Sequence, residues 1–172
     1  MTAGPNLDYV AAGAAAQLTK TLLGEDKGHG HTCKPPRKGA AGEVTAQDSD
    51  NLVTKALGVI AESGVFACGL FLLSKSGNKV GWTELKGDEV AACCTISSLL
   101  LLAESPSWKV VQPAWTGAKL DAERINERKR AIIAHLVKIS SLGLPELLLI
   151  RQVWEQTLTY ARYMMRSLRE KD

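Results

Sequence analysis

Hydrophobic residues recur at spacings of three and four along most of this chain, and no stretch alternates with period two. The first spacing gathers apolar side chains on one side of a helix, whereas strict alternation is typical of half-buried strands. The sequence therefore predicts an all-α protein. We expect a compact single-domain helical bundle over residues 1–172, with about six or seven helices.

The last predicted helix covers residues 145–169. Gly143 ends the segment before it, and Pro145 suits a first turn because the N–H that proline lacks would have no partner there. At 100° per residue the apolar positions form one broad face, made of Ile150, Val153, Trp154, Thr157, Leu158, Ala161, Met164, Met165 and Leu168. We expect this face to be buried.

A narrow stripe of arginines lies beside that apolar face. Arg151, Arg162, Arg166 and Arg169 fall within roughly 60° of one another in projection, and only Glu155 relieves their charge. One interpretation is a solvated polar face. The other is a phosphate-binding surface, since the planar fork of arginine suits phosphate better than lysine does.

The remaining helices are predicted at residues 6–23, 52–62, 65–76, 88–104 and 118–141. Asn6, Asp50 and Asp88 are the expected N-caps of three of them. Gly64 follows a serine and should separate two short helices. The second of these, residues 65–76, is apolar nearly all round and should be the most buried element.

Residues 24–49 differ from the rest, because glycine, proline and charge dominate and large apolar residues are nearly absent. This composition predicts a flexible loop or insertion. His29, His31 and Cys33 alternate within it and could each ligate zinc, but a structural zinc site needs four ligands, commonly in two pairs. No second pair is visible, so we expect no metal and no other cofactor.

Composition adds an uneven charge distribution to this picture. The net charge is only +3, but Lys and Arg against Asp and Glu give 10 − 11 = −1 over residues 1–118 and 11 − 7 = +4 over residues 119–172. Such asymmetry favours an anionic partner of the C-terminal third. Beside the arginine stripe, this third carries a second basic patch at Arg128, Lys129, Arg130 and Lys138.

The four cysteines and the N-terminus bear on location. No charged segment followed by an apolar block opens the chain, and the longest strongly apolar run, residues 95–103, is too short to span a membrane. We therefore expect a cytoplasmic protein with reduced thiols. Cys68, Cys93 and Cys94 lie in predicted helices and are interpreted as core residues.

Catalytic motifs are scarce in this sequence. It contains no phosphate-cradling glycine loop, no nucleophile elbow and no pair of metal-ligand motifs. Arg130 and His135, five positions apart, resemble the motif of the all-helical HEPN ribonucleases, with Ala131 where that family usually has a polar residue. An imidazole is a natural acid–base group, but a plain surface or core histidine is the other interpretation.

Residues 52–77 resemble the central segment of the small helical subunit of Cmr-type (type III-B) CRISPR effector complexes. In that family a glycine precedes a Leu- and Phe-rich helix that ends in Ser/Ala-Lys-Gly, and the matching residues here are Gly64, Ala67, Leu70, Phe71, Leu72, Leu73, Ser74, Lys75 and Gly77. The closing helix is similar as well, at Trp154, Tyr160, Ala161, Met164 and Met165.

This resemblance implies a subunit with no catalytic residues, taking part in antiviral defence. Copies of it would stack along a ribonucleoprotein, contact other subunits, and touch guide and target RNA phosphates without reading sequence. The expected RNA contacts are Arg151, Arg162, Arg166 and Arg169, with Arg128, Lys129 and Lys138 secondary. Two alternatives remain open: a HEPN-like ribonuclease using Arg130 and His135, and a protein–protein adaptor whose arginines pair with acidic residues of a partner.

Overall fold

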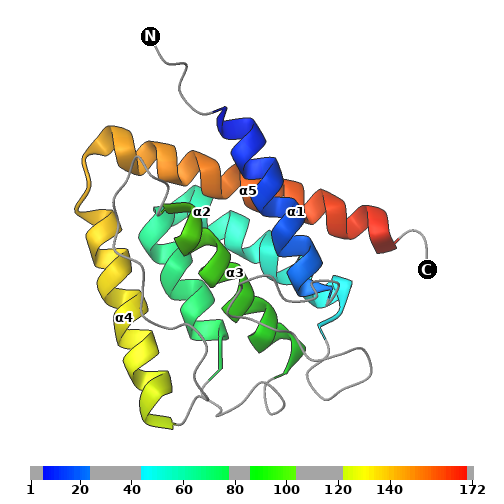
Figure 1. Cartoon of the computed structure of the whole chain (residues 1–172), viewed down its shortest axis with the longest axis horizontal. Helices are drawn as coiled ribbons and strands as arrows, with labels where there is room; N and C mark the ends of the chain where they lie inside the picture. Colours follow the sequence, from blue (N-terminus) through cyan, green and yellow to red (C-terminus); the bar gives the residue numbers. More distant parts are fainter. Residues whose placement is uncertain (1–5, 24–43, 78–85, 104–121, 170–172) are drawn as a thin grey trace.

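A computed structural model describes residues 6–23, 44–77, 86–103 and 122–169, and the fold is drawn from these ranges (Figure 1). They contain five helices and no strand: α1 (Leu7–Leu22), α2 (Ala46–Lys75), α3 (Gly87–Ala103), α4 (Ala122–Ser140) and α5 (Leu144–Arg169). The all-α prediction is confirmed, but the expected six or seven helices are five in this part of the chain. His29, His31 and Cys33 lie outside the described residues.

Helix α2 explains the lower count. The two short helices predicted on either side of Gly64 are both present and together make up α2, which is kinked at that residue by a φ of 81° and a ψ of −172°. A residue with a Cβ rarely adopts a positive φ, and glycine does so freely. The predicted interruption at Gly64 is therefore confirmed, and the two halves count as one element.

The start of α2 corrects two predictions. The helix begins at Ala46, and its N-cap is Thr45, whose hydroxyl accepts from the Asp48 N–H at 3.0 Å. Asp50, predicted as the cap, instead lies within the helix and is buried. The flexible loop predicted over 24–49 therefore does not extend over residues 46–49, which are helical.

The other two predicted caps have different outcomes. Asn6 is confirmed, because its side chain accepts from the N–H groups of Asp8 and Tyr9 as α1 begins. Asp88 is wrong by a residue or two, since α3 already includes Gly87. Aspartate in a first turn still interacts favourably with the positive end of the helix dipole.

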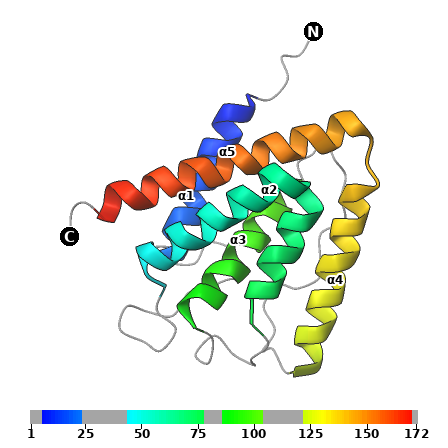
Figure 2. The ribbon, with the colours of Figure 1, turned by 180° about the vertical axis from the view of Figure 1, so that it is seen from behind.

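The described helices share one hydrophobic core. Helix α5 runs along one side of the bundle and packs against α1, α2 and α3, while α4 flanks the second half of α2 (Figure 2). The apolar face predicted for α5 is buried at Ile150, Val153, Trp154, Thr157, Leu158, Ala161 and Met165. Met164 is partly buried, and Leu168, at the end of the helix, remains exposed.

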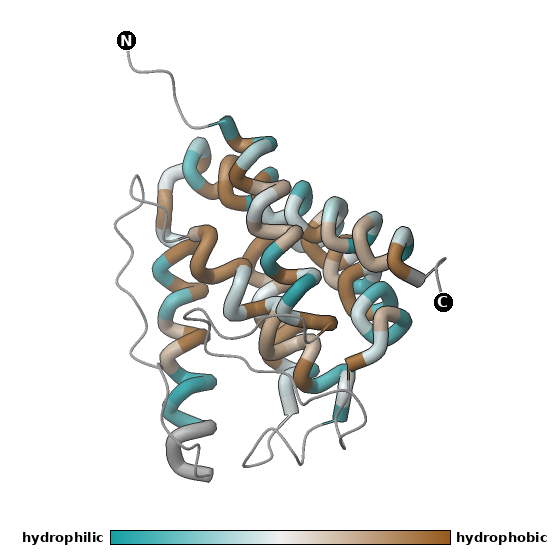
Figure 3. The backbone as a smooth tube through the Cα atoms, turned by 45° about the vertical axis from the view of Figure 1, so that its right-hand side comes forward, coloured by the Kyte–Doolittle hydropathy of each residue, from teal (hydrophilic) through white to brown (hydrophobic). Residues whose placement is uncertain are grey.

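Helices α2 and α4 meet at a glycine of α2. A Cβ built on Gly69 would lie 2.4 Å from a terminal carbon of Leu136, so a larger residue there would force the buried Leu136 side chain to move. Figure 3 shows α4 passing from hydrophilic positions at its start to alternating hydrophobic and hydrophilic positions nearer its end. One side of α4 is buried at Ile132, His135, Leu136 and Ile139.

Two further features of the core bear on the sequence predictions. Cys68, Cys93 and Cys94 are buried and are not joined in disulfides, as expected, and burial raises the pKa of Cys68 to about 12. Within the described part of the chain, α2 alone is long and apolar enough to cross a membrane, although core helices have the same composition. Here α2 is bent at Gly64 and contacts α3, α4 and α5.

Candidate nucleic-acid interface

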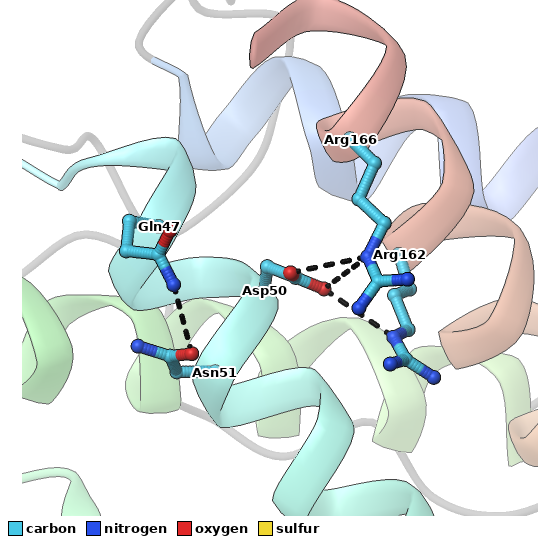
Figure 4. A network of polar contacts seen from close by, with 5 residues as sticks. All are labelled: Gln47, Asp50, Asn51, Arg162 and Arg166. Atoms are coloured by element: carbon cyan, nitrogen blue, oxygen red, sulfur yellow. Dashed lines mark hydrogen bonds and ion pairs between the residues drawn. The ribbon is translucent and has the colours of Figure 1, made fainter. Parts of the chain in front are cut away.

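Two of the predicted RNA-contacting arginines, Arg162 and Arg166, surround a buried carboxylate of α2. Arg166 Nε lies 3.2 Å from Asp50 Oδ2 and 3.3 Å from Oδ1, and Arg162 Nε lies 3.4 Å from Oδ1 (Figure 4). Asp50 is 5% exposed and joins α2 to α5 through these contacts. One carboxylate faces two guanidinium groups, so the three side chains, here called the Asp50 cluster, carry a net charge of +1.

The Asp50 cluster leaves part of each guanidinium toward solvent. The side chains of Arg162 and Arg166 are 31% and 46% exposed. Figure 4 shows the terminal nitrogens of Arg162 on the side of the guanidinium away from Asp50. A guanidinium has five N–H donors, and both arginines approach Asp50 through Nε. Asp50 can therefore fix the orientation of both forks while other donors meet an anion.

Arg151 is used differently from its two neighbours in the stripe. Its Nε pairs with Glu155 at 2.8 Å, and its Nη2 donates to the carbonyl of Ala61 at 2.9 Å. Ala61 lies in the last turn of α2 before the bend at Gly64, where regular helical bonding is interrupted. Arg151 thus ties α5 to the bend, and the structure gives it an internal role.

The fourth arginine and the second basic patch are placed as follows. Arg169 ends α5, and its side chain lies outside the described residues. Arg128 is half-buried and donates from Nη2 to the Ser97 hydroxyl of α3 at 3.3 Å. Lys129 is half-buried, whereas Lys138 is exposed. The described members of the predicted set therefore lie on two helices, α4 and α5.

Arg130 and His135 are not brought together. Arg130 is exposed, whereas His135 lies on the core side of α4, 6% exposed, with no hydrogen-bond partner for Nε2. Five residues on a helix turn about 140°, which places the two side chains on different faces. Burial lowers the pKa of His135, and the nearby charge of Lys138 lowers it further. The imidazole is therefore a neutral core group in this fold.

His135 should make stability depend on pH. The lowered pKa means that the unfolded chain takes up this proton more readily, so stability should be full above about pH 6.5 and should fall as the pH drops below it. We expect His135→Gln to reduce that fall, as measured by urea unfolding at about pH 7.5 and about pH 5.5. An equal fall in the variant would mean that other groups cause it.

Comparison with protein-family models, curated proteins and solved structures found no match for this chain. The interpretation of the site therefore depends on the geometry of its own residues. For the described ranges, these show no group of three or more His, Cys, Asp or Glu side chains placed to hold a metal ion.

Sequence reasoning missed the partner of the arginine stripe, although a signal was present. Asp50 falls at helical spacing with the apolar residues Val53, Leu57 and Ile60, so it shares one side of a helix with them. A carboxylate on a buried face requires a cation or several donors, because an unpaired buried charge is very costly. That requirement pointed to a basic residue on another element, and α5 supplies two.

Proposed function

We propose that this protein is a non-enzymatic small subunit of a type III-B CRISPR ribonucleoprotein in the cytoplasm. Copies of it stack along the complex and contact guide and target RNA phosphates without sequence specificity. The observation that carries the proposal is the Asp50 cluster, in which Arg162 and Arg166 are held by one carboxylate and keep an excess positive charge. The resemblance of residues 52–77 and of the closing helix supports the choice of complex.

The chemistry of the cluster suits a backbone ligand. A phosphate accepts hydrogen bonds from a guanidinium fork with good geometry, and such contacts fix position without reading bases. Asp50 holds the fork of Arg166 by two hydrogen bonds and that of Arg162 by an ion pair, so less side-chain freedom is lost when RNA binds. Arg151 contributes to the bend of α2 in this proposal and does not contact RNA.

Neither alternative has equal support as the main activity. A ribonuclease would need His135 at the surface near Arg130, and the imidazole is buried. An adaptor would bring carboxylates to the same exposed guanidinium donors of Arg162 and Arg166, and the resemblance of residues 52–77 favours RNA phosphates as the anion. We therefore keep RNA-backbone binding as the proposed function.

Removing the Asp50 cluster should weaken RNA binding without regard to sequence. The triple variant Asp50→Asn/Arg162→Gln/Arg166→Gln deletes both cations and the carboxylate together, so no buried charge is left unpaired. We expect roughly tenfold weaker binding to each of several unrelated single-stranded RNAs, measured by fluorescence anisotropy. The slope of log K against log salt should become shallower by about 1.4, which is two contacts at about 0.7 each.

Arg151→Gln is the matched control, because it removes an arginine of the same stripe that is bonded to Ala61 and Glu155. Its RNA affinity should stay within about twofold of the unaltered protein. Equal losses in the control and the triple variant would contradict the assigned roles. A loss confined to one RNA sequence would contradict backbone binding, and RNA binding unaffected by the triple variant would overturn the proposed site.

A further inference from the structure

Helices α2 and α4 expose large apolar side chains that lie outside the hydrophobic core. Phe66 and Leu70 of α2 are each 37% exposed, and Ile133 and Val137 of α4 are 40% and 52% exposed. Each pair is four residues apart and therefore lies on one side of its helix. All four side chains are therefore partly open to solvent.

The two pairs lie on the same side of the α2–α4 pair. The second half of α2 and α4 run in opposite directions side by side, and Gly69 faces Leu136 (Figures 1 and 2). Phe66 and Leu70 are turned about 60° and 100° from Gly69, and Ile133 and Val137 are turned equally from Leu136. For antiparallel helices in contact, equal rotations of the same sign lead to the same side.

The axial order of these four residues follows from the same register. With Gly69 level with Leu136, successive levels along the pair are occupied by Phe66, Val137, Leu70 and Ile133, about 3 Å apart. The apolar row is therefore about 9 Å long, close to the span from i to i+7 on a helix. Anchors at i, i+3, i+4 and i+7 are typical of a helix that binds in a groove.

The charges beside this row are basic. Arg130 of α4 is exposed and is turned about 120° from Leu136, in the same sense as Ile133 and Val137, and the exposed Lys138 follows about 100° beyond Val137. From residue 126 to its end, α4 has the single carboxylate of Glu127. Beyond its bend, α2 has no acidic residue. A two-fold contact between copies of this chain would bring the basic α4 surfaces together, and RNA phosphates offer nothing to the four apolar groups.

From this arrangement we propose that the α2–α4 face is a docking surface for an amphipathic helix of a partner protein whose apolar stripe is flanked by acidic residues. Leu70 and Val137, at the middle of the row, anchor the partner. Arg130 and Lys138 of α4 meet its carboxylates. The surface is separate from the Asp50 cluster, so the protein has one face for RNA and another for protein.

The test uses a fluorescein-labelled helical peptide with Leu at i, i+4, i+7 and i+11 and Glu at the flanking positions. Its affinity for the full chain is measured by anisotropy beside that of a peptide with Lys in place of each Glu. We expect the Glu peptide to bind at least roughly tenfold more tightly than the Lys peptide. Leu70→Gln/Val137→Gln should weaken the Glu peptide by roughly tenfold or more, and Tyr9→Gln/Leu101→Gln, which removes two exposed apolar residues elsewhere, by less than about twofold.

Three results would overturn the proposal. Equal binding of the two peptides would rule out a preference for an acidic partner. Equal losses of affinity in the two double variants would show that the α2–α4 face is not the binding site. Concentration-dependent dimerisation that Leu70→Gln/Val137→Gln abolishes, seen by sedimentation velocity, would assign the face to a second copy of the chain. Thermal unfolding of each variant verifies that it folds, since all four substituted positions are exposed.

Discussion

Replacing both Arg162 and Arg166 with Gln should lower the free energy of unfolding by about 3 kcal/mol, because it removes two guanidinium groups from the buried carboxylate of Asp50. Asp50 is 5% exposed, so water replaces little of the lost interaction. This loss is at the low end of the range for breaking a buried ion pair, because both arginines are partly exposed. Urea unfolding at neutral pH measures it directly.

The control for this prediction is the triple variant used for RNA binding. Adding Asp50→Asn to the two arginine substitutions removes the stranded charge, so most of the lost stability should return. The double variant would then be unstable and the triple variant stable but defective in RNA binding. If the triple variant were as unstable as the double variant, the loss of stability would come from the packing of the arginine side-chain carbons and not from the buried charge.

Regular helical patterning made much of this fold predictable. The buried face of α5 and the cap at Asn6 follow from residues close together in sequence, where the helix period and the side-chain hydrogen bond act locally. Gly64 was recognisable for the same reason. The direction in which α2 continues beyond Gly64 depends on packing against other elements, which include Arg151 at Ala61.

The features that the sequence did not predict depend on contacts between residues far apart in the chain. Projection down the axis groups the arginines of α5 correctly, but it says nothing of an aspartate that precedes them by more than a hundred residues. The same limit applies to α4, where Ile132 and Ile133 differ by one position and only the placement of α2 decides which is buried. Fold class follows from local pattern, whereas the candidate site follows from tertiary contacts.

Arginines of the same stripe, and apolar residues of the same helix, therefore have different roles in this protein. On α5, Arg151 stabilises the bend of α2 while Arg162 and Arg166 are oriented by Asp50. On α4, one side packs on α2 and the other exposes Ile133 and Val137. The bend at Gly64 matters to both, because the second half of α2 starts there and carries the surface on which α4 packs.

Substituting two glycines of α2 by alanine should give opposite changes in stability. Gly58 is exposed, and a Cβ there would meet nothing within 4 Å, so Gly58→Ala should raise the free energy of unfolding by about 0.5–1 kcal/mol through better helix propensity. Gly64 also has open space, but its φ of 81° and ψ of −172° belong to a region that is essentially restricted to glycine. Gly64→Ala should therefore lower the free energy of unfolding by about 2 kcal/mol.

Because neither site is crowded, the sign of each change reports backbone conformation alone. Urea unfolding of both variants gives the comparison, and circular dichroism verifies that helix content is kept. A stabilising Gly64→Ala would mean that α2 runs straight through this position in solution. The hydrogen bond from Arg151 to the Ala61 carbonyl would then have no unpaired acceptor to satisfy, and the internal role given to Arg151 would have to be abandoned together with the bend.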